Sequence, residues 1–132
     1  MSISDDAANL AGPVDIVPML RAERAVLLAL LQSLSEEQWA LPTECPKWSI
    51  KGIALHLLCD DLSLLSRQRD GQQSGLVGFA QTHPGLSFLE LLDGFNEAFV
   101  DGAQFLSPQL IVELLKSTGD RLTFTTRNGP TN

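Results

Sequence analysis

The chain has 132 residues, of which 44% are apolar and 19% charged, and its formal charge is −7. That length and apolar content suffice for one compact domain with a core of its own, so a second domain is not expected. Phosphate backbones and anionic lipids repel an acidic surface, so we expect neither nucleic-acid binding nor membrane attachment.

Neither a membrane span nor a secretion signal is indicated. No apolar run approaches the roughly 20 residues that a membrane-spanning helix requires, and the amino end, MSISDDAANLAGP, is acidic where a signal peptide would be basic. We therefore expect a soluble, cytoplasmic protein. Cys45 and Cys59 form no C-x-x-C pair, which argues against a disulfide framework and a thiolate zinc site, and favours buried, reduced thiols.

Residues 1–13 lack any periodicity and end in Gly-Pro, which predicts a flexible N-terminal arm. From Asp15 to Leu34, apolar residues recur at spacings of three and four, so this segment is predicted to be an amphipathic helix. Glu23 interrupts the apolar stripe of this helix. Its carboxylate either reaches water at the edge of the stripe or meets a polar partner inside the bundle.

A second helix is predicted after an extended loop that contains Pro42 and Pro46. Ser49 is the predicted N-cap of this helix, which runs to about Arg69. Residues 71–85 are rich in glycine and lack a period, so they are predicted to form a long loop that covers one end of a bundle.

A third helix is predicted from about Ser87, and the weight of phenylalanine in its apolar stripe predicts a core helix. Ser107 and Pro108 are typical of a helix start and predict a fourth helix. The overall prediction is an all-α fold, a four-helix bundle over residues 14–126 with a C-terminal tail at 127–132.

The polar residues of the second helix lie on one narrow stripe beside its leucines, because residues three and four apart share a helix face. They are Gly52, His56, Cys59, Asp60 and Ser63. A neutral imidazole is the commonest metal ligand, Asp60 can orient the ring of His56, and Gly52 leaves room for a bulky group beside it.

Two other interpretations remain open for this region. From the residues alone, a core histidine that hydrogen-bonds Asp60 or a backbone carbonyl is the favoured interpretation of His56. A metal site needs at least three protein ligands, and the remaining candidates form no recognised ligand pair. These candidates are Glu23, Cys45, Cys59, Asp60 and His83. A third possibility is a small-molecule pocket lined by Trp48, Phe95, Asn96 and Phe99.

The stretch LLALLQSLSEEQWALPTECPKWSIKGIALHLLCDDLSLLSRQRDG resembles the N-terminal part of the DinB-like four-helix-bundle superfamily. Within that superfamily it is most similar to the mycothiol-dependent maleylpyruvate isomerase N-terminal domain. The S-x-E-Q-W run, the P-T-x-C-P-x-W segment and the H-L-L of the second helix carry the resemblance. The later NEAFVDGAQFLSPQLIVELLKSTGDRL is also similar, so the resemblance spans Val14 to Leu122.

The resemblance implies that His56 is one ligand of a divalent metal, zinc or nickel, and that a small-molecule thiol is a partner of the site. The family's other ligands come from a later helix with E-x3-H or H-x3-H, a pattern that is missing here, and His83 does not match it. Three explanations are open: the chain is a fragment of a longer enzyme, a second subunit completes the site, or the fold is kept without the metal.

We therefore expect a bundle that is not catalytic as this chain alone. The missing ligand-bearing helix would leave apolar stripes uncovered, so a homodimer is expected. The alternative is a metal-dependent thiol transferase or isomerase whose site is shared between chains, with His56 assisted by Asp60, Cys59, Glu23 or His83.

Overall fold

A computed structural model of the chain describes residues 17–44 and 48–128, and within these ranges the structure is helical, with a single isolated β-bridge and no strand. The all-α prediction is confirmed. The main helices are α2 (Val17–Ser33), α4 (Ile50–Leu64), α6 (Phe88–Gly102) and α7 (Pro108–Asn128), and the short ones are α3 (Glu36–Trp39) and α5 (Gly75–Thr82). The predicted arm at residues 1–13 lies outside the described residues.

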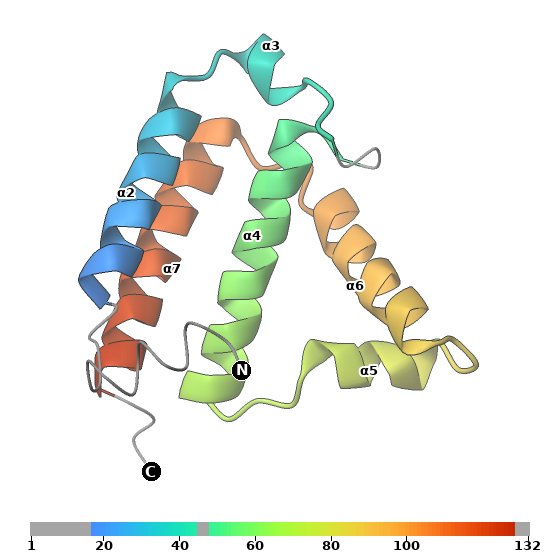
Figure 1. Ribbon diagram of the computed structural model, residues 1–132. Coiled ribbons are helices and arrows are strands. Elements are labelled where there is room, and N and C mark those ends of the chain that lie inside the picture. The colour runs from blue at the N-terminus through green and yellow to red at the C-terminus, as the bar shows by residue number, and fades with distance from the viewer. Residues whose placement is uncertain (1–16, 45–47, 129–132) are drawn as a thin grey trace, which may run out of the picture.

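Three long helices form the packed part of the molecule. α7 packs against both α2 and α4, while α4 also packs against α6 (Figure 1). The core lies along α7 and α4, where Leu55, Leu58, Ile111 and Leu115 are almost completely buried. Trp39 of α3 closes this core at one end, with only 3% of its surface exposed.

The predicted helix starts are confirmed at three serines. Ser49 caps α4 by accepting a hydrogen bond from Gly52 N, and Ser87 caps α6 by accepting one from Glu90 N. Ser107 Oγ accepts from Leu110 N at the start of α7. Each serine side chain satisfies one of the backbone donors that a helix leaves unpaired at its N-terminus.

α4 continues without a break into a π-helical turn, η1 (Leu65–Arg69), which ends at Asp70. Gly71 then has a φ of 69°, the left-handed conformation that glycine adopts without strain, and the chain turns away from the helix. The second helix therefore ends where the sequence predicts it to end.

The prediction that residues 71–85 form a loop is wrong for the middle of this segment, because Gly75–Thr82 forms the helix α5. Glycine has a low helix propensity, and the glycines of this segment are the reason why the sequence did not predict a helix there. The short helix is capped by Ser74, whose side chain accepts from Leu76 N. α5 packs against α6 across one end of the molecule, which is the position predicted for this segment (Figure 1).

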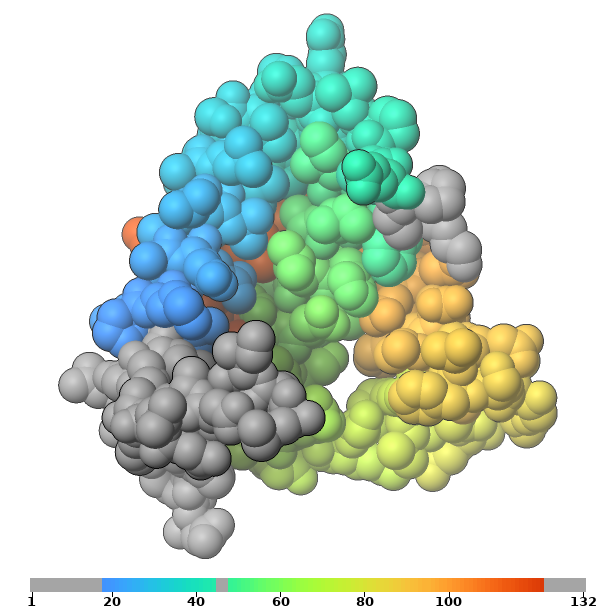
Figure 2. Space-filling model, in the orientation of Figure 1, coloured from blue at the N-terminus to red at the C-terminus, as the bar shows by residue number. Residues whose placement is uncertain are grey.

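The prediction that α6 is a core helix is confirmed only for its C-terminal part, where Val100 belongs to the core and Phe99 packs against it. Only Asn96 and Val100 of this helix are buried, while Phe88 is 65% and Leu89 69% exposed. α6 and α5 stand away from α2 and α7, and Figure 2 shows an opening bounded by α4, α5 and α6. The N-terminal part of the apolar stripe of α6 therefore faces α5 and solvent rather than the middle of a bundle.

The C-terminal boundary also differs from the prediction. α7 runs through Thr123 to Asn128, so the predicted tail at 127–132 begins inside a helix, and residues 129–132 lie outside the described part of the chain. The threonines of this segment favour strands in isolation, but the helix that precedes them extends through them.

Candidate functional site

The loop before α4 places Trp48 beside His56. Thr43 N and Thr43 Oγ1 both donate to the Trp48 carbonyl oxygen, at 3.3 and 2.8 Å, and Ile50 N donates to Leu41 O at 3.0 Å. These bonds hold the loop against the start of α4, and they fix where the indole ring can lie.

The bulky group for which Gly52 leaves room is this indole. A Cβ at position 52 would lie 2.9 Å from Trp48 Cβ, a distance that real Cβ atoms essentially never show. The Trp48 ring stacks on the imidazole of His56, with ring centroids 4.9 Å apart and an interplanar angle of 29°. Gly52 is therefore required for the close approach of Trp48, which covers one face of His56.

The two nitrogens of His56 have different surroundings. Nε2 lies 3.5 Å from Asp60 Oδ2, one helical turn further along, whereas Nδ1 is buried and has no hydrogen-bond partner among the residues that the structure describes. A buried N–H without an acceptor is rarer in proteins than an acceptor with a free lone pair. The neutral ring is therefore best accommodated with its proton on Nε2, which leaves an unpaired lone pair on Nδ1.

Cys59 is on the same helix but is buried in the packed interior, with 3% of its surface exposed. Burial raises the pKa of its thiol, and a nearby Asp60 raises it further, against the lowering effect of a hydrogen bond with Ser63. A thiol whose pKa is raised is a poorer metal ligand and nucleophile at neutral pH. The prediction of a buried thiol is confirmed for Cys59, while Cys45 lies outside the described residues.

His83 is at the C-terminal end of α5 and its contacts are local. Its Nδ1 lies 3.0 Å from the Phe79 carbonyl oxygen and 3.0 Å from Thr82 Oγ1, and its ring stacks on Phe79 with centroids 3.9 Å apart. This histidine therefore completes the end of its own helix and does not meet His56.

The described residues do not supply a full ligand set for a divalent metal. Nowhere in the ranges 17–44 and 48–128 do three His, Cys, Asp or Glu side chains come close enough together to hold an ion. Of the sequence candidates that lie within the described residues, the structure brings Asp60 to the ring of His56, at 3.5 Å. Glu23 is exposed on α2, so its carboxylate is at the edge of the stripe, in water.

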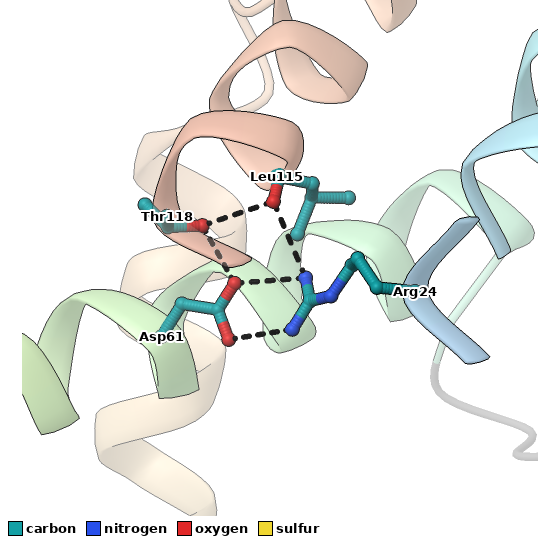
Figure 3. A network of polar contacts seen from close by, with 4 residues as sticks. All are labelled: Arg24, Asp61, Leu115 and Thr118. Carbon is teal, nitrogen blue, oxygen red and sulfur yellow. Dashed lines mark hydrogen bonds and ion pairs between the residues drawn. The ribbon is translucent and has the colours of Figure 1, made fainter. Parts of the chain in front are cut away.

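A polar cluster that the sequence analysis missed ties three helices together (Figure 3). The guanidinium of Arg24 donates to both carboxylate oxygens of Asp61, at 2.9 and 3.1 Å. Thr118 Oγ1 donates to Asp61 Oδ2 at 2.6 Å, and Arg24 Nη1 also lies 3.4 Å from the Leu115 carbonyl oxygen. Both oxygens of the buried Asp61 carboxylate therefore accept hydrogen bonds from side chains of α2 and α7.

The role of this cluster is structural. The Asp61 side chain is 7% and that of Arg24 25% exposed, and a bidentate pair fixes the rotation of both helices about their axes. Gly119 gives the arginine its space, because a Cβ there would lie 3.0 to 3.2 Å from the Arg24 side chain. The sequence does contain a signal for this pair: Arg24 and Asp61 each lie three and four residues from leucines, on the apolar stripes of two different helices.

Two surface cavities are formed by other residues than those of the predicted pocket around Trp48, Phe95, Asn96 and Phe99. A cavity of about 400 Å³ lies between α2, α3 and α7, with Trp39, Glu36 and Glu113 in its wall. A groove of about 290 Å³ runs between α2 and α4 and is almost wholly apolar. Neither cavity contains His56.

The sequence profile of the mycothiol maleylpyruvate isomerase N-terminal domain matches residues 20–130. No curated protein and no solved structure matches the chain. Within the described residues, no helix is both long and apolar enough to cross a membrane.

Proposed function

Since the chain belongs to the mycothiol maleylpyruvate isomerase N-terminal domain family, we propose that it is a DinB-like bundle domain with one imidazole of a divalent-metal site. His56 is that ligand, and the chain alone does not complete the site. It is accordingly not catalytic as a single chain, and it acts in the cytoplasm as a self-associating domain.

The unpaired Nδ1 of His56 carries this proposal. A buried ring nitrogen without a partner is costly in a purely structural role, because a core histidine normally satisfies both nitrogens. The carboxylate of Asp60, close to Nε2, is placed to orient the ring as a carboxylate orients a ligating imidazole in many metal sites. Even if both His56 and Asp60 are counted, the described residues offer fewer than the three protein ligands that a catalytic metal site requires.

The alternative is a metal-dependent thiol transferase or isomerase, as the family's name suggests. A zinc or nickel ion would polarise a bound thiol and lower its pKa. The remaining ligands would come from another chain or from residues outside the described ranges. In that case His56 and Asp60 would position the ion, and the Trp48 ring would exclude water from one side of it.

Zinc affinity, measured by competition with a chelating dye on protein stripped of metal, tests the proposal. We expect weak binding by the wild type, weaker binding by His56→Ala and no change in His83→Ala, which removes the other histidine. Equal affinities in all three proteins would show that His56 is not a ligand. Tight binding of one ion per single chain would favour the enzyme.

A further inference from the structure

An apolar groove separates α2 from α4. Both helices pack on α7, and parts of α7 are visible between them in Figure 2. Leu27, Leu30 and Leu31 of α2 form one wall together with Leu34, which follows the helix, and Ile53 and Leu57 are part of the other. The groove has the shape of a helix position that three packed helices leave open in a four-helix bundle.

The outer face of α2 is apolar as well. Met19, Val26 and Leu30 are 55%, 70% and 57% exposed, and they lie seven and four residues apart, on one stripe of the helix. Leu30 belongs both to this stripe and to the wall of the groove. The helix therefore presents an apolar ridge next to an apolar groove, and such a surface is complementary to itself.

Charge distinguishes this surface from the exposed apolar side chains of α6. α2 contains two arginines and one glutamate, a net charge of +1, and α4 contains one lysine and two aspartates, a net charge of −1, so the two helices together are neutral. α6, with exposed Phe88 and Leu89, carries four acidic residues and no basic one. Two chains of charge −7 can therefore meet at α2 and α4 with the least repulsion.

We propose that the groove between α2 and α4 binds helix α2 of a second copy of this chain. The inference rests on the proposed self-association and names its surface. Two-fold symmetry makes the contact reciprocal: each α2 lies between α2 and α4 of the partner. The ridge of one copy fills the groove of the other, so both apolar surfaces are buried together.

The size of the contact sets the expected affinity. A helix of 17 residues is about 26 Å long and about 10 Å wide. Burying one such ridge and the groove beside it removes on the order of 500 Å² of surface per copy, near the lower limit for a specific interface. We therefore expect a dimer that dissociates at micromolar concentrations.

Sedimentation velocity over a concentration series tests the interface, with two variants in α2 and one matched control. Leu30→Asp and Val26→Asp each place a carboxylate on the ridge at a position that is already exposed, so the fold should tolerate them. Leu89→Asp makes the same change at an exposed leucine of α6. Circular dichroism of each variant confirms that the helices are retained.

We expect a wild-type dimer, a rise of at least about 30-fold in the dimer dissociation constant for both α2 variants, and no change for Leu89→Asp. A wild type that is monomeric at every concentration overturns self-association and the interface together. A dimer that survives both α2 variants, or that only Leu89→Asp disrupts, overturns the interface alone. A monomer destabilised by Leu30→Asp would mean that the chain's own residues fill the groove. The zinc measurement is independent of all these outcomes.

Discussion

Asp60 and Asp61 are adjacent in the chain but about 100° apart around α4, and this rotation gives them different roles. The Asp60 side chain is 55% exposed and approaches the imidazole of His56. That of Asp61 is 7% exposed and receives three hydrogen bonds from Arg24 and Thr118. The first carboxylate belongs to the candidate metal site and the second to the interior.

The substitution Asp61→Asn should cost about 2 to 3 kcal/mol of unfolding free energy, because it leaves the Arg24 guanidinium without its countercharge. We place the value below that of a fully buried pair, since a quarter of the Arg24 side chain is exposed. The neighbouring Asp60→Asn is the matched control, and it should change the free energy by no more than about 0.5 kcal/mol. Urea denaturation measures both; equal losses would contradict the assignment of the buried role to Asp61.

Gly52→Ala should destabilise the protein by about 1 to 2 kcal/mol, since the new methyl group would displace Trp48 from the imidazole of His56. Alanine is otherwise the better helix former. The control is Gly78→Ala in α5, where nothing lies within 4 Å of the new Cβ and a gain of about 0.5 to 1 kcal/mol is expected. Thermal unfolding of the two variants should therefore shift in opposite directions, and a gain at position 52 would show that Trp48 is not held there.

The residue scale also shows what the sequence could not reveal. Helical spacing predicts Asp60 near His56, and the structure confirms this proximity. The spacing also indicates room beside Gly52, but it does not reveal that Trp48 fills it. The pairing of Arg24 with Asp61 joins residues 37 positions apart. Spacing within one helix indicates that each is on an apolar stripe, but only the packing of two helices on α7 decides which charge meets which.

At the scale of elements, two helices begin with a capping box. At α3 the box pairs Ser35 with Gln38, and at α6 it pairs Ser87 with Glu90. The hydrogen bonds from the backbone and side chain of Ser87 lower the pKa of Glu90. Because the folded-state pKa is the lower one, this box contributes its stability above the ordinary pKa of glutamate and loses it as the pH falls through the folded value.

Glu90→Gln should remove this acid dependence while it preserves α6, because glutamine caps a helix in the same way at Gln38. Helicity followed by circular dichroism, from neutral pH to about pH 3, compares the variant with the wild type. We expect the wild type to lose more helicity than the variant at low pH. Identical pH profiles would mean that the box does not stabilise α6.

Serine caps made the starts of α4, α6 and α7 predictable, since the cap and the first turn lie within a few residues of each other. α5 was not predictable in the same way, because its glycines lower helix propensity and α6 supports it from outside. The core assignment failed for the N-terminal part of α6 for a related reason: an apolar stripe shows that a helix has a face to bury, but not whether the chain covers it.

At the scale of the whole molecule, the packing is uneven. α4 and α7 contain most of the completely buried side chains, whereas α5 contains no buried residue and packs against α6. Regions with few buried apolar contacts open at lower free energy than the core. The pair of helices α5 and α6 should therefore unfold locally, independently of α2, α4 and α7.

Hydrogen exchange read by mass spectrometry should show this difference. Amides of α5 are expected to exchange at least about 100-fold faster than those in the middle of α4 and α7, which require global unfolding. Peptides that cover residues 75–82 and 111–118 provide the comparison within one sample. Equal protection of the two segments would show that α5 and the core unfold together.

The central claim is that this chain alone does not complete a divalent-metal site around His56. Elemental analysis for zinc and nickel, on protein purified without added metal or chelator, tests it most directly. We predict that the wild-type chain retains far less than one ion per chain, as does the His56→Ala variant. One ion per single chain that is lost in His56→Ala would contradict the claim, because it would show a complete site and favour the metal-dependent thiol enzyme.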